Sequence, residues 1–271
     1  MTSPTPLSLF LVGWAMMAAF QAVLWLVQRA RRDAGVVDVG WAAGLGILAL
    51  FYAWADDGWL PRRTLLAAVV SIWAFRLAFY LLRDRVLHAQ EEDGRYQELR
   101  AAWGDRAQPW FFVFFQAQGL IDSILSIPFL IILAKKTGPF TPWDLVAVAV
   151  WLVAVVGESI ADRQLAAWRA NPAHRGRTCR SGLWAWSRHP NYFFEWLHWW
   201  TYPLLAIGAP WAAATLFAPA FMLFFLFKVT GIPATEARAL VTRGDDYRRY
   251  QREVPMFFPR PPRRHAGTDP R

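Results

Sequence analysis

Long apolar runs recur along the whole chain, and their length limits the folds that it can adopt. A helix needs about 20 predominantly apolar residues to cross a bilayer, and 56% of the 271 residues are hydrophobic. The pattern therefore predicts an all-α integral membrane protein with seven transmembrane helices. The seven apolar segments are residues 7–27, 37–55, 64–82, 110–134, 143–161, 192–207 and 211–227.

The basic residues between these segments predict an orientation. Twenty-four Lys and Arg residues fall in the connections of one side and four in those of the other, with Arg76 inside a helix. Because cytoplasmic connections carry the excess of basic residues, we expect the N-terminus outside and the C-terminus in the cytoplasm. The net charge of +9 therefore reflects topology, and no nucleic-acid partner is expected.

The sequence also predicts the domain organisation and indicates which kinds of site are not expected. Residues 1–259 are predicted to form a single seven-helix domain, and residues 260–271 a disordered basic tail. A single cysteine and scattered histidines indicate no metal site. Neither a glycine-rich dinucleotide motif nor a P-loop is present, so no soluble-type nucleotide domain is expected.

Several polar residues interrupt the apolar segments, where they are costly and usually functional. Asp38 begins the second segment, and Arg76 and Tyr80 lie four residues apart on one face of the third. Glu158 and Asp162 have the same spacing in the fifth. We interpret these side chains as the lining of a cavity; the alternative is an Arg76–Asp38 ion pair that only holds two helices together.

Residues 182–195 concentrate the polar chemistry. Proline is favoured in the first turn of a helix, so Pro190 predicts a helix start, with Asn191 and Glu195 on one face. Arg188 and His189 precede this start, and helix N-termini attract anions. The segment therefore predicts a site for a phosphorylated or carboxylated ligand; the alternative is a basic turn that contacts lipid headgroups.

Residues 182–195 (GLWAWSRHPNYFFE) resemble the steroid 5-alpha-reductase family of membrane reductases, and are most similar to its bacterial branch of uncharacterised members. The Arg-His-Pro-x-Tyr core alone also resembles the isoprenylcysteine carboxyl methyltransferases. Further matching pieces are DVGW at 38–41, WAFRL at 73–77, DGRY at 93–96, GESIADRQL at 157–165, GIP at 231–233, DYRRY at 246–250 and VP at 254–255.

The resemblance implies NADPH bound on the cytosolic side and a carboxylate–tyrosine pair as the catalytic groups. Asp38 and Tyr80 would form that pair, with Arg76 beside them, although the steroid enzymes carry a Gln-Glu pair where this chain has Asp38 alone. The residues that would contact the cofactor are Asp162, Arg169, Trp186, Arg188, His189, Asn191, Tyr192, Glu195, Glu236 and Tyr247.

Three classes of function follow from these patterns. The first is an NADPH-dependent reductase of a C=C bond conjugated to a carbonyl in a lipophilic, steroid- or isoprenoid-like substrate, in which a tyrosine polarises the carbonyl. The second is a membrane methyltransferase that uses S-adenosylmethionine, and the third is a lipid-binding or transport protein. Asp162, Arg169 and Glu195 favour the first. We expect a multi-pass protein of the bacterial inner membrane, in contact with membrane lipids.

Overall fold

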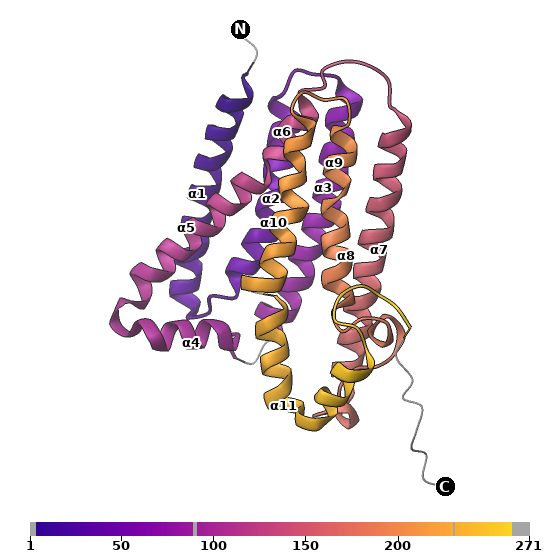
Figure 1. Cartoon of the computed structure of the whole chain (residues 1–271). Helices are drawn as coiled ribbons and strands as arrows, with labels where there is room; N and C mark the ends of the chain where they lie inside the picture. Colours follow the sequence, from indigo (N-terminus) through magenta and orange to yellow (C-terminus); the bar gives the residue numbers. More distant parts are fainter. Residues whose placement is uncertain (1–3, 89–90, 230, 262–271) are drawn as a thin grey trace. The chain divides into compact units, whose positions relative to one another are not determined.

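The computed structural model describes residues 4–88, 91–229 and 231–261, and every regular element within them is helical. The tail predicted to be disordered lies mostly outside the described residues. The helices are α1 (Pro6–Arg31), α2 (Val36–Ala55), α3 (Leu60–Leu81), α4 (Gly94–Trp103), α5 (Ala107–Leu125), α6 (Ile127–Leu133), α7 (Pro142–Ala170), α8 (Pro190–Trp199), α9 (Thr201–Ala206), α10 (Phe217–Phe224) and α11 (Ile232–Glu253) (Figure 1).

Six helical stretches in the described part of the chain are long and apolar enough to cross a membrane, which indicates a multi-pass integral membrane protein. The predicted sixth segment, 192–207, is instead divided between α8 and α9 at Trp200. Pro203 has no N–H to donate to the carbonyl of Trp199, four residues earlier, so the regular helix is interrupted between Trp199 and Thr201. The six stretches are Pro6–Arg31, Val36–Ala55, Leu60–Leu87, Gly94–Leu133, Pro142–Ala170 and Ala212–Glu253.

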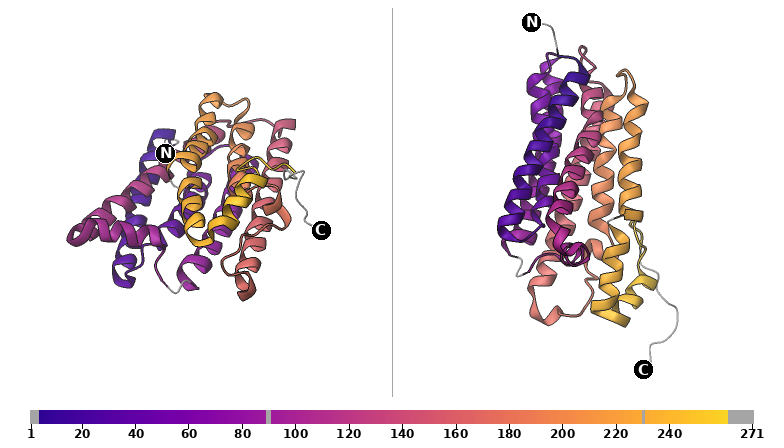
Figure 2. Two further views of the ribbon diagram at one scale, coloured as in Figure 1. Left: turned by 60° about the horizontal axis from the view of Figure 1, so that its bottom comes forward. Right: turned by 90° about the vertical axis from the view of Figure 1, so that its left-hand side faces the viewer.

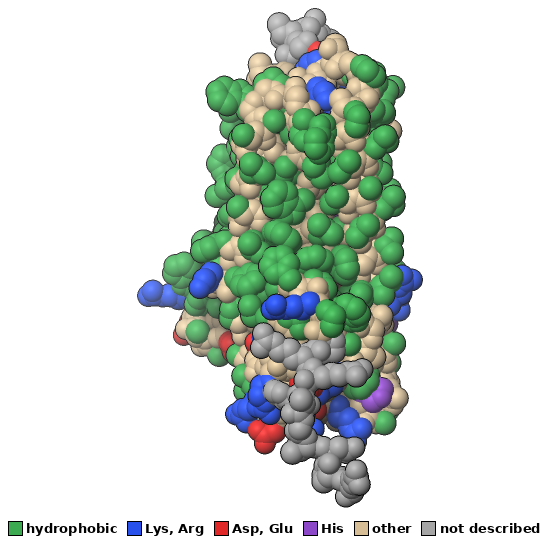
Figure 3. Space-filling view, turned by 45° about the vertical axis from the view of Figure 1, so that its right-hand side comes forward, with side chains coloured by type: hydrophobic (Ala, Val, Ile, Leu, Met, Phe, Trp, Pro, Cys, Tyr) green, Lys and Arg blue, Asp and Glu red, His purple; other side chains and the backbone are tan. Residues whose placement is uncertain are grey.

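Helix α7 shows how the sequence suits an apolar solvent. Glu158 and Asp162 are almost fully buried, at 3% and 4% exposure, whereas Leu145 and Val153 are 71% and 56% exposed. A water-soluble helix has the opposite arrangement. In the space-filling view, hydrophobic side chains cover much of the helical surface, and Lys and Arg side chains gather near its ends (Figure 3).

The chain divides into two compact units. Unit 1 comprises Met1–Pro139 and Ala206–Thr215, and unit 2 comprises Phe140–Leu205 and Leu216–Arg271. In unit 1, α2 packs against both α1 and α3, and α1 also packs against α5 (Figure 2). Its fully buried side chains include Trp73, Phe111 and Phe115.

In unit 2, α7 packs against α8, and α8 packs against α10. Gly157 permits the first of these contacts, because a Cβ there would lie 2.4 Å from the Phe194 ring. Gly244, with a φ of 51°, breaks the regular course of α11. Glycine adopts this left-handed conformation without steric cost, so α11 bends and Tyr247 and Tyr250 both become buried.

Candidate functional site

In unit 1, Asp38 is the centre of a cluster that draws on three segments. Its carboxylate accepts hydrogen bonds from the Tyr96 hydroxyl at 2.8 Å and the Arg95 guanidinium at 3.1 Å, and Arg85 forms an ion pair with it. Arg85 lies in the π-helical turn Leu82–Leu87 that follows α3, and the other two donors lie in the first turn of α4. We call this set the Asp38 cluster.

The start of α4 fixes this arrangement. Asp93 caps the helix by accepting from the backbone N–H of Arg95 at 3.0 Å, and it also accepts from the Arg95 guanidinium at 3.2 Å. Burial opposes ionisation of Asp93, but the hydrogen bonds from Arg95 outweigh it and lower the pKa of Asp93 to about 2. Asp93 therefore stays charged at neutral pH and orients Arg95 toward Asp38.

The tyrosine hydroxyl that donates to Asp38 belongs to Tyr96, whereas the family resemblance implied Tyr80 for this place. Arg76 and Tyr80 both lie on α3, one turn apart and half-buried. Neither Arg85 nor Arg95 was predicted as a site residue. The DGRY piece at 93–96 was the available signal for Arg95 and Tyr96.

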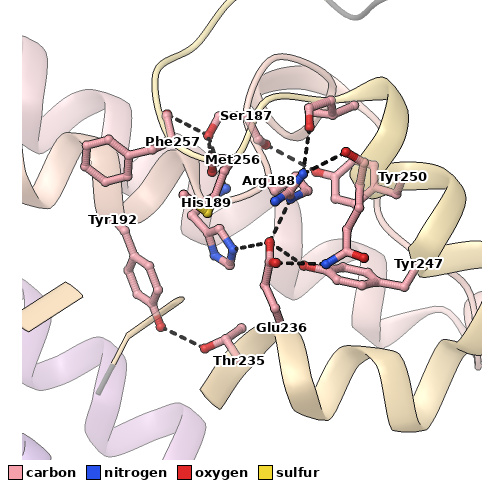
Figure 4. Close-up of polar contacts among 12 residues, drawn as sticks. Ser187, Arg188, His189, Tyr192, Thr235, Glu236, Tyr247, Tyr250, Met256 and Phe257 are labelled. Carbon is pink, nitrogen blue, oxygen red and sulfur yellow. Dashed lines mark hydrogen bonds and ion pairs between the residues drawn. The ribbon is translucent and has the colours of Figure 1, made fainter. Parts of the chain in front are cut away.

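In unit 2, four of the predicted cofactor residues form one network centred on Glu236 (Figure 4). Its carboxylate accepts from Arg188 Nε at 2.7 Å, from His189 Nε2 at 3.1 Å and from the Tyr247 hydroxyl at 3.4 Å. Gln251 Nε2 donates to the second oxygen at 2.8 Å. Arg188 is thus bound within the protein, and we call this set the Glu236 network.

His189 is almost completely enclosed in this network. Its ring lies parallel to that of Tyr192, with centroids 5.4 Å apart. Burial lowers the pKa of His189 from its ordinary value of 6.5, although the contact with Glu236 opposes this shift. Folding therefore favours the neutral imidazole, and this part of the stability is present above pH 6.5 and is lost as the pH falls below it.

The residues after α11 form hydrogen bonds with residues 186–188, which precede α8. We call residues 254–261 the C-terminal strap. Ser187 Oγ donates to the Phe257 carbonyl of this strap at 2.8 Å, and the Arg188 N–H donates to its Pro255 carbonyl at 2.9 Å. The guanidinium of Arg188 also donates to the Val254 carbonyl at 3.1 Å. In return, the Arg260 N–H donates to the carbonyl of the half-exposed Trp186 at 3.0 Å.

Helices α7 and α8 carry three more of the predicted residues. Helix α8 begins at Pro190, which confirms the expected helix start. Asn191 Nδ2 donates to Asp162 Oδ1 of α7 at 3.4 Å. Glu195 is buried and accepts from Trp199 Nε1 of the same helix at 3.1 Å.

Arg169, the last predicted residue, lines a pocket of about 210 Å³ in unit 2. The ring of His174 lies on that of Trp168, 3.6 Å apart and nearly parallel, and forms an aromatic part of its wall. No Asp or Glu is among the lining residues in the described chain. We call it the cationic pocket; it is lined by Leu165, Trp168, Arg169, His174, Arg175, Gly176, Arg177, Cys179 and Arg243.

Apart from Arg169, the residues of this pocket were not predicted as site residues from the sequence. Arg175 and Arg177 were visible only as part of a basic connector, and a charge run does not reveal whether its members converge. Arg243 comes from α11, far along the chain. The convergence depends on the tertiary fold of unit 2.

Comparison with known proteins identifies the family of this chain. No solved structure matches the chain significantly. It is similar to the uncharacterized protein C594.04c of Schizosaccharomyces pombe, with 26% identity over 279 residues, which cover 93% of this chain and 80% of that protein. The family model described as "protein of unknown function (DUF1295)" matches residues 24–254. The chain therefore belongs to the DUF1295 family.

Proposed function

We propose that this protein is an NADPH-dependent membrane reductase of a C=C bond conjugated to a carbonyl in a lipophilic, steroid- or isoprenoid-like substrate. The cationic pocket is the observation that carries this proposal. Four arginines are among its lining residues, and no Asp or Glu of the described chain is. Arginine guanidinium groups bind phosphate through charge-assisted, often bidentate hydrogen bonds.

The same pocket argues against S-adenosylmethionine. That cofactor carries a sulfonium cation and no phosphate, so four guanidinium groups would repel part of it. NADPH carries a pyrophosphate and a phosphomonoester, which match the charge of the pocket. Arg169, Arg175, Arg177 and Arg243 would hold these phosphates. The polar side chains of Asp162 and Asn191 suit hydroxyl and amide groups of the same cofactor.

The Asp38 cluster supplies the acid that such a reduction needs. Bound NADPH would supply the hydride. The Tyr96 hydroxyl, which donates its single proton to Asp38 in this structure, would turn that proton toward the substrate carbonyl oxygen as negative charge develops there, and would transfer it to that oxygen. Asp38 positions the oxygen of this hydroxyl, 2.8 Å away, and Arg85 and Arg95 in turn hold the Asp38 side chain through ion pairs.

We also propose the full seven-span topology, with the N-terminus outside and the C-terminus in the cytoplasm, and with α8 and α9 together forming the sixth of the seven spans. The excess of basic residues on one side supports this orientation. Reporter fusions after Arg32, Arg106 and Arg271 should all indicate the cytoplasm. A periplasmic signal from the last fusion would contradict the seven-span topology.

The cofactor assignment is tested by titrating the detergent-solubilised protein with NADPH and with S-adenosylmethionine. We expect NADPH alone to raise the melting temperature. Arg175→Gln and Arg177→Gln should each weaken NADPH binding roughly tenfold to a hundredfold, the loss expected for one charge-assisted hydrogen bond. Arg248→Gln is the matched control, because Arg248 is 60% exposed and pairs with Asp245 outside the pocket.

Unchanged NADPH affinity in both pocket variants would remove the assignment of the cationic pocket. Stabilisation by S-adenosylmethionine alone would favour the methyltransferase instead. Equal weakening in Arg248→Gln would show that the general charge of the protein, and not the pocket, determines binding.

A further inference from the structure

A second pocket, in unit 1, is lined entirely by apolar side chains and takes no part in the proposed reaction. Its volume is about 280 Å³. It is built from the start of α1, from α6 and from the connection Ala206–Thr215, all of which belong to unit 1. We call it the apolar pocket; it is lined by Pro6, Phe10, Ile127, Leu130, Ile131, Ala134, Pro210 and Trp211.

The break between α5 and α6 explains why the space exists. Pro128 lacks the N–H that would continue α5, and Ser126 stabilises the break by donating to the Ser123 carbonyl at 2.7 Å and by bonding to the Tyr52 hydroxyl at 3.1 Å. Helix α5 runs obliquely across α1, and α6 follows it in a different direction after the break (Figure 1). Side chains of α6 and of the start of α1 line the space that results.

The lining selects a hydrocarbon occupant. None of the eight side chains offers a hydrogen bond except the indole of Trp211, which is 84% exposed. A buried water needs two to four polar partners, so the pocket does not suit water. An empty pocket would forfeit the dispersion contacts of its walls. An alkyl chain from the surrounding membrane would restore those contacts.

A cation stands at the end of this lining. Lys135 directly follows Ala134, and its ammonium donates to the Ile207 carbonyl at 3.2 Å. An ammonium has three donors, so further donors remain for an anion. The neighbouring Lys136 instead contacts the carboxylates of Asp56 and Asp57.

Trp211 marks the same rim. Its φ of 61° is a left-handed conformation that is uncommon and costly for a residue other than glycine. Tryptophan is enriched at the level of the lipid headgroups. The apolar pocket suits an acyl chain, Lys135 beside it suits a phosphate, and the Trp211 indole suits the level of the headgroups. The three features therefore match the parts of one phospholipid.

We propose that the apolar pocket binds one acyl chain of a membrane phospholipid, whose phosphate contacts Lys135. This lipid site takes no part in the proposed reductase reaction. The test of lipid binding therefore does not depend on whether the protein is a reductase. A lipid held in this way would fill the space between α1 and α6 and stabilise the N-terminal end of unit 1.

Native mass spectrometry of the detergent-solubilised full chain with added phosphatidylglycerol tests this proposal. We expect one retained lipid on the parent protein and none on Ala134→Trp, whose indole would fill the pocket. Lys135→Gln should weaken retention roughly tenfold by removing a charge-assisted contact with phosphate, and should leave binding of uncharged diacylglycerol unchanged. Val153→Trp on the exposed face of α7 is the control and should retain the lipid.

A second measurement does not require a pocket-filling variant to fold. The fluorescence of Trp211 is obtained as the difference between the parent protein and Trp211→Phe. Phosphatidylglycerol with brominated acyl chains should quench this fluorescence already at a low mole fraction of brominated lipid. Quenching only in proportion to the bulk mole fraction would overturn the proposal. Retention of the lipid by Ala134→Trp to the level of the parent would overturn it as well.

Discussion

Tyr96→Phe is expected to lower turnover by roughly 10²-fold or more, the usual contribution of a positioned general acid, while NADPH affinity stays nearly unchanged. The substitution removes the hydroxyl that donates to Asp38 at 2.8 Å and retains the buried ring. Asp38→Asn should act in the same direction, and the double variant should be less than additive because the two residues would act as a unit. NADPH oxidation with a panel of lipophilic enones, steroidal and isoprenoid, measures the effect.

Two further tyrosines give this experiment its controls. Tyr52→Phe removes a hydroxyl that is equally buried in unit 1 but bonds to Ser126, so turnover should remain close to that of the parent. Tyr80→Phe tests the residue that the sequence pattern favoured. A large loss of turnover in Tyr80→Phe together with full activity in Tyr96→Phe would transfer the acid role to α3.

Glu236→Gln is expected to destabilise the protein by about 3–5 kcal/mol, the range for removal of one partner of a buried ion pair. Glu236 accepts hydrogen bonds from four side chains, and the side chain of Arg188 is only 11% exposed. The neutral amide would leave that guanidinium without its counter-charge. Thermal unfolding of the purified protein without cofactor provides the measurement.

Asp245→Asn is the matched control for this change. Asp245 also lies on α11 and also pairs with an arginine, but its side chain is 94% exposed. Exposed pairs contribute at most about 1 kcal/mol, so the melting temperature should scarcely change. If Glu236→Gln melts at the temperature of the parent but binds NADPH weakly, Arg188 serves the cofactor directly and the Glu236 network is not structural.

Much of the helical architecture could be predicted, because apolar runs of membrane-spanning length have few alternatives in a bilayer. The start of α8 at Pro190 was also predictable, since proline suits the first helical turn. The division of segment 192–207 into α8 and α9 could have been found from Pro203, which lies inside the run. Hydropathy alone does not register the loss of one backbone donor.

The candidate site was predictable only where its residues are close in sequence. Spacing placed Arg76 and Tyr80 on one helix face, and the family resemblance made Tyr80 the favoured partner of Asp38. The partnership of Asp38 with Tyr96 instead depends on how α2 meets α4. In the same way, Arg188 and His189 suggested an anion site until the contacts with Glu236 on α11 were visible.

The proposed reaction transfers a hydride from NADPH to a lipophilic substrate. The most direct measurement incubates the purified protein with a membrane lipid extract, with NADPH deuterated at the transferring position and with S-adenosylmethionine labelled in its methyl group, followed by mass spectrometry of the lipids. This reaction predicts a lipid that gains one deuterium on carbon together with one proton, and its formation roughly 10²-fold more slowly with Tyr96→Phe. A lipid that instead gains the labelled methyl group, with no deuterium in any product, would contradict it.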